Sequence, residues 1–144
     1  MKILFKSKEL VKSKEGGLES NVTGYWLVES KKLFSIVLLC FDRGSREAYH
    51  NHAFNSISWI LSGRLNERIK YSNGFIDVLL TPSIKPVFTS RSRMHKVSGL
   101  DRKTWVLSFR GPWLDTWKEF FVGTNKEVTL TYGRKIVNNY EAYY

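Results

Sequence analysis

The chain contains three histidines, His50, His52 and His95, and their spacing is the feature that points most directly to chemistry. On a β-strand, residues two apart project from the same face, about 6–7 Å from one another along the chain. Two imidazoles on one face, joined by a third from a distant strand, suit a divalent metal ion. A pair at this spacing also arises by chance among half-buried, hydrogen-bonding histidines, so both interpretations stay open.

Polar residues near the histidine pair, and arginines on later predicted strands, are candidates for contacts around such a site. Asn55 follows the pair as a weak fourth ligand or a hydrogen-bond partner of a histidine. Ser56 and Ser58 share the alternation parity of the two histidines, which predicts that they face inward. An arginine fork pairs with two oxygens of a substrate carboxylate or phosphate. The arginine candidates are Arg64, Arg93 and Arg110, although an exposed position suits Arg64 and Arg110 equally well.

The elements that must position these residues are short strands. Segments rich in β-branched, aromatic and leucine residues alternate with glycine-containing turns, and no segment before residue 112 keeps a helical period. This pattern predicts an all-β sandwich or small barrel. The best helical candidate is 113–121, where an irregular aromatic segment is the alternative. Strands are expected at 3–5, 25–28, 33–41, 56–69, 75–80, 85–89, 95–98 and 104–110, with turns at 43–45, 72–74 and 99–101 and a bend, bulge or turn at Gly63.

The length of 144 residues suits one domain. We divide it into a basic N-terminal arm over 1–20, a barrel over 21–122, and a tyrosine-rich tail over 123–144 that packs on the barrel or extends it. The longest apolar run, 36–41, is far shorter than the ~20 residues of a membrane span. The N-terminus lacks the sustained apolar region of a secretory signal, and a single cysteine, Cys40, suits a reducing cytoplasm. We therefore expect a cytoplasmic protein with no membrane partner.

Charge is the strongest feature of the composition. Lys and Arg number 23 against 13 Asp and Glu, which gives a formal net charge of +10. Such a balance favours anionic partners, namely nucleic acid, phosphorylated metabolites or an acidic protein surface. The basic residues are spread over the chain, so they indicate weak attraction to polyanions and no sequence specificity. Solubility alone also accounts for the charge.

The spacing Gly44-x5-His50-x-His52-x10-Gly63 resembles the first motif of the cupin superfamily. In that family a second motif ends in a histidine about 40 residues later, and His95 matches it. The resemblance implies a cupin-type double-stranded β-helix, or jelly-roll, barrel with a short aromatic C-terminal segment. It also implies that His50, His52 and His95 are metal ligands.

Two longer stretches are similar to a group of small single-domain cupin-like proteins, some of them phage-encoded. These are HNHAFNSISWILSGRLNE and HKVSGLDRKTWVLSFRGPWLDTWKEF, which lie between about 44 and 120. The sequence departs from the pattern at three places. Asn55-Ser56-Ile57 stands where an acidic ligand is expected, Lys96 replaces an arginine, and Lys118-Glu119 replaces a glycine-containing pair.

A site of three histidines without the acidic ligand resembles that of the thiol dioxygenases among the cupins, which hold ferrous iron. Zinc, nickel and manganese also accept imidazole ligands. The resemblance implies a metal-binding cupin, specifically a non-haem iron dioxygenase acting on a small anionic or thiol substrate. It also implies a homodimer, and a host cytoplasm if the protein is phage-encoded. The alternatives are a non-catalytic basic cupin module that binds nucleic acid or a protein partner, and a sugar-nucleotide isomerase or epimerase.

Overall fold

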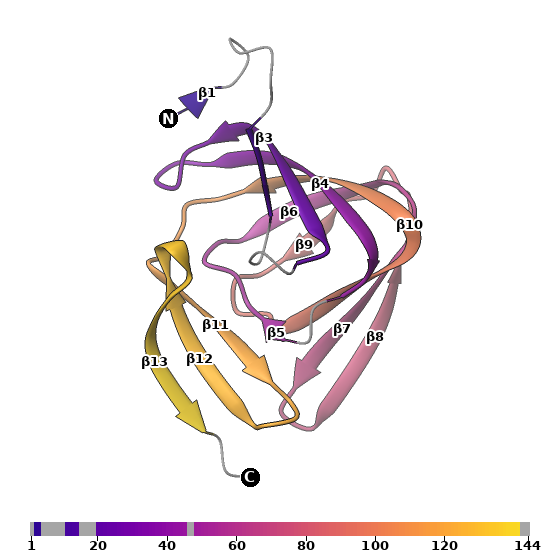
Figure 1. Cartoon of the computed structure of the whole chain (residues 1–144). Helices are drawn as coiled ribbons and strands as arrows, with labels where there is room; N and C mark the ends of the chain where they lie inside the picture. Colours follow the sequence, from indigo (N-terminus) through magenta and orange to yellow (C-terminus); the bar gives the residue numbers. More distant parts are fainter. Residues whose placement is uncertain (1, 4–10, 15–19, 46–47, 142–144) are drawn as a thin grey trace.

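A computed structural model describes residues 2–3, 11–14, 20–45 and 48–141, and these residues form one antiparallel sheet that rolls into a barrel (Figure 1). The all-β prediction is confirmed. In this part of the chain no helix has the length and apolar character needed to cross a membrane. The elements are β1 (Lys2–Ile3), β2 (Val11–Lys14), β3 (Val22–Glu29), β4 (Ser35–Gly44), β5 (Tyr49–His50), β6 (Ser56–Ser62), β7 (Leu65–Tyr71), β8 (Gly74–Leu80), β9 (Val87–Thr89), β10 (His95–Arg110), β11 (Thr116–Phe121), β12 (Lys126–Thr131), the 3₁₀ turn η2 (Tyr132–Arg134) and β13 (Lys135–Glu141).

Strand β10 is the central strand of the barrel because it pairs with four other strands, β4, β5, β6 and β7. Its first residues pair with β7, and with β5 at His95, whereas its second half lies between β4 and β6 (Figure 1). The predicted turn at 99–101 is wrong: the register shifts between Gly99 and Lys103, but the strand continues. The backbone of Gly99 packs so closely on the carbonyl of Asp42 that a Cβ atom would overlap it. The glycine therefore marks a close approach of two strands and not a chain reversal.

The turns before and after β7 lie where the sequence predicted them. Gly63, with φ +77°, reverses the chain between β6 and β7 as predicted. Ser72 and Asn73 form the two-residue turn between β7 and β8, while Gly74 is already paired with Tyr71. The hairpin of β7 and β8 also contains a bidentate ion pair, in which Arg68 donates to both carboxylate oxygens of Asp77 at 2.8 Å. The hydrogen bonds from Arg68 lower the pKa of Asp77 to about 2.

We predict that Gly63→Ala destabilises the protein by roughly 1–3 kcal/mol, because a non-glycine residue there is strained. Its Cβ would overlap the Thr104 hydroxyl and lie 2.7 Å from the Lys103 carbonyl oxygen. Thermal unfolding measures the loss. Gly123→Ala is the matched control, since a Cβ at that position meets no atom within 4 Å. Equal melting temperatures for the two variants would contradict the prediction.

The sheet continues beyond β10 into the C-terminal part of the chain. The helical candidate at 113–121 is wrong, because Thr116–Phe121 forms β11, which pairs with β5 on one side and β12 on the other. Trp113, Trp117 and Phe120 recur at the spacing of four and three residues that is typical of a helix, so pairing with β5 and β12 overrides the local pattern. Strands β12 and β13 then extend the sheet. At the other end, β1 and β2 pair with β3, whereas residues 4–10 and 15–19 of the predicted arm, with most of the strand expected at 3–5, lie outside the described residues.

The hydrophobic core lies inside the barrel on the inward faces of β3, β4, β6, β7 and β10. Full burial of an aliphatic or aromatic side chain stabilises a fold by about 1.5–3 kcal/mol. Part of this core also forms the floor of a cavity, which holds the histidines. The core cluster consists of Trp26, Val37, Leu39, Phe41, Ile60, Leu65 and Val106.

Candidate metal centre

The barrel encloses a cavity of about 510 Å³, within the roughly 300–1,000 Å³ range of small-molecule sites. Apolar core residues of β4, β6, β7 and β10 line its floor. Aromatic residues near β11 and η2, including Trp113 and Tyr132, also line the cavity. All three histidines of the chain line this cavity.

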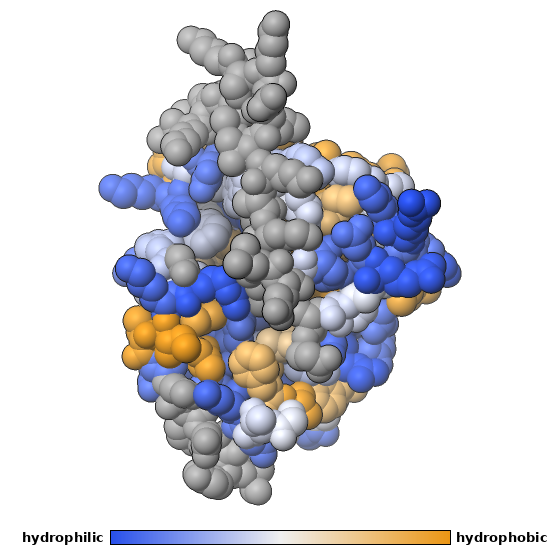
Figure 2. Space-filling model, in the orientation of Figure 1, coloured by the Kyte–Doolittle hydropathy of each residue, from blue (hydrophilic) through white to orange (hydrophobic). Residues whose placement is uncertain are grey.

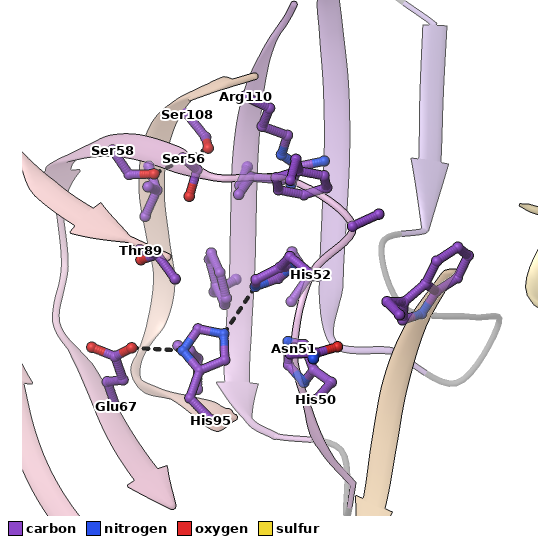
Figure 3. Close-up of a pocket in the computed structure, with 18 of the residues that line it drawn as sticks. His50, Asn51, His52, Ser56, Ser58, Glu67, Thr89, His95, Ser108 and Arg110 are labelled. Carbon is purple, nitrogen blue, oxygen red and sulfur yellow. Dashed lines mark hydrogen bonds and ion pairs between the residues drawn. The ribbon is translucent and has the colours of Figure 1, made fainter. Parts of the chain in front are cut away.

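The structure brings His50, His52 and His95 together (Figure 3). His50 ends β5 and pairs across the sheet with His95, the first residue of β10, whereas His52 follows in the loop rather than on a strand. One ring nitrogen from each residue lies within 4.8 Å of the others. The Nε2 atoms of His52 and His95 are 2.9 Å apart.

This geometry fits a divalent metal ion. When two imidazole nitrogens bind the same ion, each at about 2.1 Å and with an N–metal–N angle of about 90°, the nitrogens lie about 3.0 Å apart. The observed 2.9 Å between His52 Nε2 and His95 Nε2 matches that spacing. It is also the length of a hydrogen bond between the two rings, so the pair is satisfied in the metal-free protein.

A buried carboxylate fixes the orientation of His95. Glu67 Oε1 lies 2.6 Å from His95 Nδ1 and 3.3 Å from an Arg93 nitrogen, and its side chain is only 4% exposed. Burial raises the pKa of Glu67, but the hydrogen bond from His95 and the positive charges of His95 and Arg93 outweigh it and hold the pKa below its usual value. In the neutral form of His95, the form that can bind a metal ion, the ionised carboxylate accepts the Nδ1 proton and the lone pair of Nε2 is directed at His52.

Three of the six predicted neighbours line the cavity, and two of them are Ser56 and Arg110. Arg110 is only 5% exposed, and its guanidinium lies 4.6 Å from the ring centre of Phe54 and 5.3 Å from that of Trp26. Its predicted alternative, an exposed position at the end of a strand, is therefore wrong. Ser58, which shares the parity of Ser56, also faces the cavity.

The structure does not bring the other three candidates into the cavity. Arg64 forms a two-pronged ion pair with Asp101 on the surface. Arg93 contacts Glu67 from outside the lining. The Asn55 side chain accepts a hydrogen bond from the backbone N–H of Arg91 and so holds a loop together.

Glu67, Thr89 and Ser108 are among the polar residues of the cavity that the sequence analysis did not name as candidates. A signal for Glu67 was present, because it alternates with Leu65 and Ile69, both buried, and so shares their inward face. Ser108 alternates in the same way with Val106 on β10.

Comparisons with solved structures identify the architecture. A sugar phosphate isomerase of the cupin superfamily from Silicibacter pomeroyi matches with a TM-score of 0.63 and 12% identity, over 96% of this chain and 92% of that chain. Fe(II) HppE matches with a TM-score of 0.57 and 16% identity over 71% of this chain. The capsular polysaccharide assembling protein CapF from Staphylococcus aureus matches with a TM-score of 0.58 and 13% identity over 76% of this chain.

The present chain covers 56% of HppE and 30% of CapF, so it corresponds to only part of those proteins. A scan against protein-family models and a search of the curated proteins found no match. At these identities the likeness concerns the fold. The rolled antiparallel sheet and the structural matches together show that the chain has the fold of the cupin superfamily.

Proposed function

We propose that the protein is a metal-dependent cupin enzyme, with ferrous iron as the favoured ion and a small anionic or thiol compound as substrate. The observation that carries the proposal is the convergence of three histidine nitrogens inside the cavity, with Glu67 fixing the proton on one of them. His50, His52 and His95 would hold the ion. Fe(II) HppE, which shares the fold, supports the choice of iron.

The chain's own residues supply the surroundings for such a reaction. When bound, a ferrous ion with three protein ligands keeps positions open for substrate and supplies redox chemistry towards oxygen. Leu39, Phe41 and Ile60 form an apolar floor that limits the access of bulk water. Arg110 provides a fixed positive charge for an anionic substrate. The barrel therefore combines three histidine ligands for a metal ion with a partly apolar cavity large enough for a small substrate.

The test is elemental analysis of protein purified without a chelator or an affinity tag, followed by oxygen-consumption assays with thiols and small acids. We expect about one iron per chain and substrate-dependent oxygen uptake. Another metal at that ratio would retain the site and contradict the dioxygenase proposal. Absence of metal even after reconstitution would contradict the metal site itself.

A second candidate is the non-catalytic basic module, which the +10 charge favours. In the antiparallel register of β4 and β10, Lys103 lies opposite Asp42, so the exposed residues Arg102 and Arg43 lie near each other on neighbouring strands. Figure 2 shows a broad hydrophilic area on one side of the molecule. Oligonucleotide binding that weakens steeply with salt and survives loss of the histidines would support this alternative. Homodimer formation and cytoplasmic location stay predictions.

A further inference from the structure

The cavity has a second polar region, distinct from the histidines. Ser56, Ser58, Thr89 and Ser108 line it, and we call these four residues the hydroxyl wall. Figure 3 shows the three serines grouped together above the histidines, with Thr89 between them and Glu67 in this view. Arg110 reaches the same region from the end of β10.

Strand register explains why these groups lie together. Ser56 on β6 pairs with Thr89 on β9 and with Arg110 on β10, which places the three in one row across the sheet. Ser58 pairs with Ser108 in the next row of inward-facing residues, and their hydroxyls are 3.0 Å apart. The wall is thus a patch two rows deep on rigid strands rather than a set of loop residues.

The chemistry of the hydroxyl wall is unusual for a barrel interior. The neighbouring inward residues on the same strands, Ile60 and Val106, are apolar and belong to the core. Burial of hydroxyl groups is unfavourable unless they form hydrogen bonds. Each hydroxyl donates one hydrogen bond and accepts two, and the Ser58–Ser108 pair uses one donor. The remaining capacity faces the cavity and suits a ligand that is itself rich in hydroxyl groups.

Charge adds a second requirement on the ligand. The described lining residues include one carboxylate, that of Glu67, and four cationic side chains, Lys31, Lys96, Arg110 and Arg134. Arg110 is the buried one of these cations, at 5% exposure, and the rings of Phe54 and Trp26 hold its guanidinium in place. A single guanidinium fork matches the charge and the two oxygens of one carboxylate.

We infer that the cavity binds a small polyhydroxylated carboxylic acid. Arg110 pairs with its carboxylate, the hydroxyl wall binds its hydroxyl groups, and the rest of the molecule extends towards the histidines. The inference rests on the proposed function, because it names the substrate class of the same cavity. A compound without hydroxyl groups would leave the buried wall without its hydrogen bonds, which weakens binding strongly.

Three six-carbon probes separate these requirements. Gluconate has both the carboxylate and the hydroxyl groups, glucitol has only the hydroxyl groups, and hexanoate has only the carboxylate. Isothermal titration calorimetry on chelator-treated protein is expected to show gluconate binding at least about tenfold more tightly than either of the others. Equal affinities for the three, or no gluconate binding, would overturn the inference.

Variants locate the binding on this wall. Arg110→Lys keeps the charge but not the fork, and Ser108→Ala removes one hydroxyl; we expect gluconate affinity to fall about ten- to a hundredfold in the first and several-fold in the second. Arg64→Gln is the matched control, because this arginine lies on the surface outside the cavity. Melting temperatures identify a variant that has not folded, and Ser108→Ala then carries the test. Equal losses in all three variants would overturn the assignment.

Metal uptake by the same protein after removal of the chelator separates this inference from the proposed function. Gluconate binding that depends on Arg110 in protein that takes up no metal would contradict the metal enzyme and support the hydroxyl-wall site. Protein that loads one metal ion per chain but shows no preference for gluconate would support the metal site and overturn the present inference.

Discussion

His52→Ala is expected to abolish stoichiometric metal binding while leaving the barrel folded. Its Nε2 atom lies 2.9 Å from that of His95, where a shared ion would bind both. Changing even a hydrogen-bonded neighbour of a metal ligand lowers affinity about 10–100-fold, so loss of a ligand should exceed that. Because His52 lies in a loop after β5, its removal breaks no strand pairing. Metal content after dialysis, measured together with circular dichroism melting curves, tests both parts.

His95→Ala is expected to lose the metal as well, but with a cost to the fold. His95 is 5% exposed and donates to Glu67, so its removal leaves that carboxylate, among the described residues, with only the more distant Arg93 as an ionic partner. Removing one partner of a buried hydrogen bond costs about 1–3 kcal/mol, and more when the group left behind is charged, as the Glu67 carboxylate is. Lys96→Ala is the control, since Lys96 lines the cavity without belonging to the histidine cluster. Full metal retention in His52→Ala would show that the histidines are structural.

Much of the fold could be predicted from local patterns. Runs such as Ser35–Phe41 contain β-branched and large apolar residues, and glycines with positive φ, such as Gly63, separate the strands. These signals depend only on a residue and its near neighbours. They are enough to predict an all-β chain, and the histidine spacing adds the resemblance to cupins.

The exceptions arise where distant contacts decide the structure. Gly99 looks like a turn residue, yet it keeps β10 continuous because Asp42 from β4 packs against it. Trp117 and Phe120 looked compatible with a short helix, yet they lie on β11 because its edges pair with β5 and β12. Strand β4 is far from Gly99 in the sequence and β5 is far from β11, so no local pattern shows these two pairings.

The candidate site also contains features that the sequence predicted and features that depend on the pairing of distant strands. The convergence of the histidines could be anticipated from the resemblance to cupins, although His52 lies in a loop after β5 and not on a strand. Alternation predicted that Ser56 and Ser58 of the hydroxyl wall face inward. Their grouping with Thr89 and Ser108 could not be predicted, because it depends on which residue of β6 pairs with which residue of β9 and β10. Arg64 illustrates the converse: it follows the positive-φ turn at Gly63, where the alternation of faces restarts, and it lies on the surface with Asp101.

Glu67→Gln is expected to weaken metal binding about 10–100-fold and to destabilise the metal-free protein. The carboxylate is 3% exposed and accepts hydrogen bonds from both His95 and Arg93. A glutamine oxygen still accepts from one of them, but the charge assistance, about 1.5–3 kcal/mol for a hydrogen bond to a charged group, is lost. Competition with a chelator of known affinity measures the metal binding, and thermal melting measures the stability.

The matched control for Glu67 is Glu127→Gln, which removes the same charge from a more exposed pair with Lys118. Exposed pairs contribute about 0–1 kcal/mol, so its effect on melting should be small and its effect on metal affinity absent. The two readouts separate two roles of Glu67. If Glu67→Gln lowers the melting temperature but leaves metal affinity unchanged, the carboxylate only balances the charge of Arg93. If both fall, its hydrogen bond to His95 Nδ1 also holds Nε2 in the form that binds metal, since this bond connects the buried charge to the histidine cluster.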